Sequence, residues 1–138
     1  MKLLLDRICL AVLGLTSAYV GIYACFATAS WYATFPGFGL RWLPQLGPFN
    51  EHLAKDVGAA YLSFAVLSLV ALAHVRRQVV VRLAGAALLT FNVLHFAYHL
   101  TMLHVYEPRD RVLNVLTLGL VVLLSVVLVV PARRGDLR

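Results

Sequence analysis

Four long apolar stretches constrain this chain more than any other feature of its sequence. They cover about residues 8–35, 53–74, 82–104 and 112–130 of a 138-residue chain. A helix that crosses the hydrocarbon core of a bilayer needs about 20 mostly apolar residues, so there is room for four spans with short connections. Only 13% of the residues are charged and 62% are hydrophobic, whereas soluble domains carry roughly 25% charge. The sequence therefore predicts an all-α, four-transmembrane-helix bundle, with residues 1–138 forming one integral membrane domain.

Small residues recur along the first span at Gly14, Ala18, Gly21 and Cys25. Such a stripe lets another helix approach closely, within the chain or from a second copy of it. Cys9 and Cys25 would lie about 24 Å apart on one helix, too far for a disulfide, so we expect both to pack as small side chains. The segment 27–29 resembles a signal-peptidase site. The apolar run is longer than the roughly 7–15 residues of a signal peptide, so an uncleaved span is expected.

The connection between the first two spans, residues 36–50, holds three prolines and three glycines. These residues disfavour a regular helix. Its several large apolar side chains suggest that it lies against the membrane surface or folds over the bundle as a lid. Trp31, Tyr32 and Phe35 precede it and fit an aromatic belt at the interface. Asn50 or Glu51 is expected to cap the second span. Pro108 is expected either to interrupt helical structure or to begin the helix of the fourth span.

The basic residues predict the orientation of the bundle. The two chain ends and the turn between spans two and three contain eight Lys and Arg residues. The connections on the opposite side of the membrane contain four, which acidic residues balance. Since cytoplasmic loops carry the excess of Lys and Arg, both termini should be cytoplasmic, with the long loop facing outward. This distribution also explains the net charge of +6 without nucleic acid. The eight are Lys2, Arg7, Arg76, Arg77, Arg82, Arg133, Arg134 and Arg138; the four are Arg41, Lys55, Arg109 and Arg111.

Two polar runs stand out within these apolar segments. His95 and His99 are four residues apart in the third span, with His104 beyond them, and His52 and Asp56 have the same spacing where the second span begins. Residues four apart share one face of a helix. Ionisable groups inside a membrane are costly, so they usually face the bundle interior and have partners.

Helix rise places the two runs at matching depths. At 1.5 Å per residue, Asp56 and His99 both lie about 10 Å from the membrane centre, and Tyr61 and His95 within roughly 3 Å of it. Spans joined by a tight turn are antiparallel neighbours. We therefore predict contacts between the second and third spans at three depths, and we call each depth a tier. The main predicted contact is Asp56 with His99. The other two tiers are Glu51 or His52 with His104, and Tyr61 with His95 and Asn92.

Three interpretations of this cluster compete. It can be a hydrogen-bonded seam that fixes helix pairing. It can bind zinc, iron or copper through ligands drawn from two imidazoles on one helix face and their neighbours. It can also handle protons or bind a small ligand such as a quinone, since histidine titrates near neutrality. The metal set comprises Glu51, His52, Asp56, His95, His99 and His104, and the residues for a small cofactor are Tyr61, Asn92 and His95. A haem is disfavoured because His95 and His99 share one face.

The opening of the second span, Glu51-His52-Leu-Ala-Lys55-Asp56-Val-Gly58, resembles the DoxX-like group of small bacterial integral membrane proteins. That resemblance implies a four-helix bundle in a bacterial inner membrane, with some members linked to redox or thiol-stress partners. The third span is outside this likeness. We expect a small membrane module whose His/Asp site binds a metal or ligand. A homo-oligomer and a larger membrane complex are the two assemblies in which it could serve as a subunit. A membrane oxidoreductase component and a purely structural seam are the alternatives, so no catalytic residue is assigned.

Overall fold

Four long helices form the protein in a computed structural model, which describes residues 1–131. They are α1 (Lys2–Phe26), α3 (Glu51–Ala73), α4 (Gln78–Thr101) and α5 (Pro108–Val129). Each is long and apolar enough to cross a membrane. This confirms the predicted all-α architecture with four candidate spans. Arg133, Arg134 and Arg138, used to predict the orientation, lie outside the described residues.

The first span differs from its predicted range of 8–35. Helix α1 begins at Lys2 and ends at Phe26, and a short helix α2 (Thr28–Thr34) follows. The charged head can be helical because Lys2 and Asp6, four residues apart, form an ion pair on one face of the helix. The backbone leaves the helical region at Ala27, with φ −135° and ψ 47°, and this break separates the interfacial aromatic residues from the span.

The segment between α2 and α3 folds into short elements. Strand β1 (Pro36–Gly37) pairs with β2 (Leu40–Arg41), and a 3-10 turn, η1 (Leu43–Gln45), follows. The hairpin turns through positive φ at residues 37–39, two of which are glycines. Trp42 is buried, and its ring meets that of Tyr106 edge-on at 6.4 Å. The segment is therefore packed on the bundle.

Both predicted helix starts are confirmed. The side chain of Asn50 accepts a hydrogen bond from the Leu53 N–H at 3.1 Å, which caps α3. Pro108 is the first residue of α5, where its missing N–H costs nothing. A second 3-10 turn, η2 (Leu103–Val105), connects α4 to that start.

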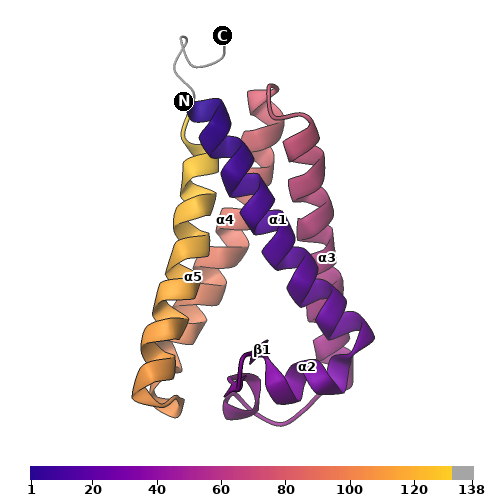
Figure 1. Cartoon of the computed structure of the whole chain (residues 1–138), viewed down its shortest axis with the longest axis vertical. Helices are drawn as coiled ribbons and strands as arrows, with labels where there is room; N and C mark the ends of the chain where they lie inside the picture. The colour runs from indigo at the N-terminus through magenta and orange to yellow at the C-terminus, as the bar shows by residue number, and fades with distance from the viewer. Residues whose placement is uncertain (132–138) are drawn as a thin grey trace.

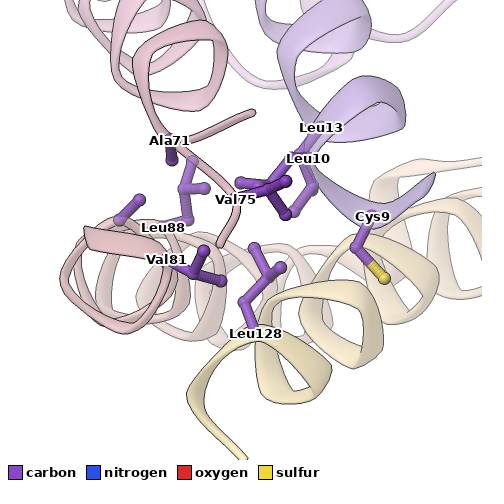
Figure 2. Packing of buried hydrophobic residues seen from close by; sticks show 9 residues of the cluster. Cys9, Leu10, Leu13, Ala71, Val75, Val81, Leu88 and Leu128 are labelled. Atoms are coloured by element: carbon purple, nitrogen blue, oxygen red, sulfur yellow. The ribbon is translucent and has the colours of Figure 1, made fainter. Parts of the chain in front are cut away.

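The main hydrophobic core lies in the half of the bundle nearest the N-terminus. All four long helices contribute to it, as Figure 2 shows for Leu10, Leu13, Ala71, Leu88 and Leu128. A smaller cluster around Ala24, Trp31 and Ala54 lies toward the other end, and it draws only on α1, α2, α3 and the segment between α2 and α3. The four helices therefore share a core at one end of the molecule.

Toward the other end the helices separate into two pairs. Helix α1 packs mainly on α3, and α4 on α5, while α3 and α4 make few contacts (Figure 1). Glycines set the α1–α3 pair: a Cβ on Gly21 would lie 2.8 Å from the Leu62 backbone nitrogen, and one on Gly58 would lie 2.8 Å from the Cys25 backbone nitrogen. The predicted small-residue stripe is thus occupied by α3 of the same chain.

Six serine and threonine hydroxyl groups within the spans hydrogen-bond to their own helices. Each of these hydroxyls donates to the carbonyl four residues earlier. The bond avoids the free-energy cost of a polar group without a hydrogen bond in hydrocarbon. These are Thr16, Ser63, Ser68, Thr90, Thr117 and Ser125.

Candidate functional site

Two histidines and a tyrosine meet where α4 ends and α5 begins. The rings of His95 and His99 are 4.5 Å apart between centroids and are inclined at 63°. His95 also stacks on Phe91, with centroids 5.3 Å apart and planes 14° apart. The Tyr106 hydroxyl lies 3.5 Å from Nδ1 of His99. We call His95, His99 and Tyr106 the imidazole cluster.

The phenol of Tyr106 stays protonated at neutral pH. Burial, together with a smaller effect of the neighbouring phenol of Tyr98, raises the pKa of Tyr106 to about 12. The neutral hydroxyl can donate to His99. Asn114 approaches it from α5 and is only 1% exposed. In residues 1–131 neither polar atom of this amide has a partner with hydrogen-bond geometry. A polar amide with unused hydrogen-bonding capacity therefore lies beside the imidazole cluster.

Most imidazole nitrogens of the cluster are also unused. Within residues 1–131, no hydrogen bond reaches either ring nitrogen of His95 or Nε2 of His99. Unsatisfied polar groups in a membrane are costly. A bound molecule that donates to or accepts from these nitrogens would remove that cost.

The predicted Asp56–His99 contact is wrong. The Asp56 carboxylate instead lies 3.3 Å from Nε2 of His52, and these two side chains are 64% and 89% exposed. His99 is only 7% exposed and lies against Tyr106. The prediction assumed that α3 and α4 stay neighbours along their full length. The two helices separate because the glycines of α1 and α3 hold α3 against α1, whereas α4 packs on α5.

The outermost predicted tier does not form either. Glu51 pairs with Lys55 of its own helix at 3.0 Å, and Nδ1 of His104 lies 3.1 Å from the carbonyl oxygen of Thr101. The six residues predicted as metal ligands thus fall into separate groups. In the part of the chain that the structure describes, no three His, Cys, Asp or Glu residues gather where they could hold a metal ion.

The middle predicted tier, Tyr61 with His95 and Asn92, does not form as predicted. Tyr61 meets Phe91 edge-on at 5.3 Å, and Phe91 stacks on His95, so one aromatic ring separates the two predicted partners. Asn92 turns toward α5 and donates to the Ser125 hydroxyl at 2.9 Å. This buried bond joins α4 to α5. Any role of Tyr61, Asn92 or His95 in holding a cofactor stays a prediction.

Replacing Ser125 with alanine should lower the free energy of unfolding by about 0.6–1.7 kcal/mol, which spans the average and the largest value that double-mutant cycles give for hydrogen bonds between membrane helices. The variant removes the acceptor of the Asn92 amide. Ser63→Ala is the matched control, because the one side-chain hydrogen bond of Ser63 within the described residues is to the carbonyl of Ala59 in its own helix. Equilibrium unfolding in mixed micelles compares the two. Equal effects would show that the bond between the helices contributes nothing.

A second polar cluster was missed in the sequence. The Lys2 ammonium lies 2.6 Å from the Asp6 carboxylate and donates to the carbonyl of Val127. The Gln78 amide donates to the other oxygen of Asp6 at 3.2 Å. Lys2 and Asp6 are buried, although they lie in the charged head. The i, i+4 spacing of Lys2 and Asp6 was the available signal, but only the packing of α4 and α5 shows that the pair is enclosed.

No protein-family model, curated protein or solved structure matches this chain.

Proposed function

We propose that the protein is a small multi-pass membrane module whose imidazole cluster binds a small ligand with hydrogen-bonding atoms. One observation carries this proposal: both ring nitrogens of His95 and Nε2 of His99 lack hydrogen bonds in residues 1–131, beside a phenol that stays neutral. Ligand sites of this kind combine apolar walls with a few convergent polar groups. Phe91 and Trp42 supply the aromatic surroundings here.

The chemistry available to such a site is acid–base and coordinative. Imidazole can accept or donate a proton, and the Tyr106 hydroxyl can fix the tautomer of His99. A transition-metal ion held by His95 and His99 would need its other ligands from outside this cluster. An oxidoreductase component would require the bound ligand to be redox-active, so the optical spectrum of the purified protein decides that alternative.

We expect purified protein to contain a stoichiometric ligand or metal that is lost from the His95→Ala/His99→Ala double variant. Elemental analysis, an optical spectrum and mass spectrometry of organic extracts measure this, on protein prepared without chelators or a histidine tag. The control is His74→Ala/His104→Ala, because both of those rings lie against carbonyl groups of nearby residues. Wild-type protein with neither metal nor small molecule would contradict the proposal.

A structural seam is the second candidate, and the buried Asn92–Ser125 bond favours it. Membrane helices use such bonds to fix their pairing. The two functions differ in what the double histidine variant loses. A seam predicts lower stability with no ligand to lose, whereas a ligand site predicts ligand loss in a folded bundle.

The setting of the module is also part of the proposal. The proposed membrane is a bacterial inner membrane, which the DoxX-like resemblance implies. The excess of basic residues at the ends and in the turn between α3 and α4 supports cytoplasmic termini. Membership of the DoxX-like group is supported by four spans and by the charged opening of α3. Cysteine labelling from each side of the membrane tests the orientation.

A further inference from the structure

A hollow of about 210 Å³ lies at the same end of the bundle as the imidazole cluster, between the hairpin segment and the start of α5. Arg41 and Gln45 line it from one side, and Glu107 and Asp110 from the other. Tyr106 forms part of its wall. The hollow thus carries a cation and two carboxylates brought together from segments more than sixty residues apart.

Within the described residues, the opposite charges that line this hollow form no ion pair with each other. The Arg41 Nε donates to the carbonyl of Ala33 at 3.0 Å, and within the described residues Arg41 has no carboxylate within 4 Å. In the same residues Glu107 forms no ion pair, and Asp110 has only Arg109 at 3.9 Å. A ligand with both a positive and a negative group would complement each charge with its opposite.

The position of the hollow indicates where this ligand comes from. It adjoins the first residues of α5, a candidate membrane span, and Trp42 lies buried beside its Tyr106 wall. Trp and Tyr gather at the depth of the lipid headgroups. A molecule that enters the hollow from the membrane would therefore present its headgroup.

We propose that this hollow binds the headgroup of phosphatidylethanolamine. The phosphate would lie toward Arg41, since a guanidinium recognises phosphate oxygens through several N–H groups. The primary ammonium would lie toward Glu107 and Asp110, whose carboxylates accept its hydrogen bonds. Phosphatidylcholine carries a quaternary ammonium without N–H donors, and phosphatidylglycerol carries no cation, so both should bind less well. This inference does not depend on the imidazole cluster binding a ligand.

The test is native mass spectrometry of protein taken from vesicles with equal amounts of phosphatidylethanolamine and phosphatidylcholine. Phosphatidylcholine cannot donate the charge-assisted hydrogen bonds of a primary ammonium, so we expect roughly tenfold enrichment of phosphatidylethanolamine on wild-type protein. The Glu107→Gln/Asp110→Asn variant should reduce the ratio to about one. Arg41→Gln should weaken binding of both lipids.

Glu51→Gln/Lys55→Gln is the matched control, because this exposed pair lies at the start of α3 and outside the hollow. It should keep the wild-type enrichment. Circular dichroism and thermal unfolding establish that each variant is folded, and single substitutions replace any double variant that is not. Equal binding of the two lipids to wild-type protein, or unchanged enrichment in folded hollow variants, would overturn the proposal.

A separate arm distinguishes lipid from a soluble source of the same chemistry. Free O-phosphoethanolamine and a short-chain phosphatidylethanolamine are added to detergent-solubilised protein, and thermal unfolding is followed. The lipid should raise the midpoint at concentrations where free phosphoethanolamine does not. Equal effects of the two would overturn a lipid as the occupant.

Discussion

Gly58→Ala is expected to lower the free energy of unfolding by about 1–3 kcal/mol, as overpacking of a filled interior does. The added Cβ would lie 2.6 Å from the Cys25 sulfur and 2.8 Å from the Cys25 backbone nitrogen. A side chain could rotate away, but relieving the second contact requires α1 and α3 to move apart. The loss should appear in equilibrium unfolding in mixed micelles.

Gly119→Ala is the control for this prediction. A Cβ there has Phe96 as its nearest neighbour, at 3.8 Å, an ordinary contact. Both glycines lie inside long helices, where alanine gains about 1 kcal/mol in helix propensity. Gly119→Ala should therefore be neutral or stabilising, and the difference between the variants isolates the helix contact. Similar effects at both positions would show that the α1–α3 approach is not tight.

Lys2→Met is expected to cost about 3–5 kcal/mol, because it leaves the buried Asp6 carboxylate without its cation. Asp6 is fully buried, and among residues 1–131 it would retain only the Gln78 amide as a side-chain donor. The double variant Lys2→Met/Asp6→Leu should recover most of that loss, since no buried charge then remains. Chemical unfolding of the two variants and the wild type forms a double-mutant comparison.

Lys55→Met provides the matched exposed pair for the Lys2 prediction. Lys55 and Glu51 are also four residues apart on one helix, at 3.0 Å, but both are more than half exposed. Solvent screens such pairs, so this substitution should change stability little. A Lys2→Met effect no larger than that of Lys55→Met would contradict a stabilising role for the buried pair.

The sequence by itself determined the number and kind of helices. Apolar length predicted four spans, and local chemistry predicted two of their starts, because the Asn50 cap and Pro108 act within one helical turn. Close spacing also placed His95 beside His99, since residues four apart share a helix face whatever the rest of the fold does.

Only the tertiary structure decided which helix faces meet. Depth along the membrane matched Asp56 with His99, but depth leaves the lateral separation of two helices undetermined. The backbone contacts at Gly21 and Gly58 hold α3 on α1, so Asp56 turns to His52 and His99 to Tyr106. Partners far apart in the chain also depend on which helices pack together. Asn92 with Ser125 joins α4 to α5, and Asp6 with Gln78 joins α1 to α4. Helix pairing is set by the fit of whole surfaces, which residue spacing along one helix does not contain.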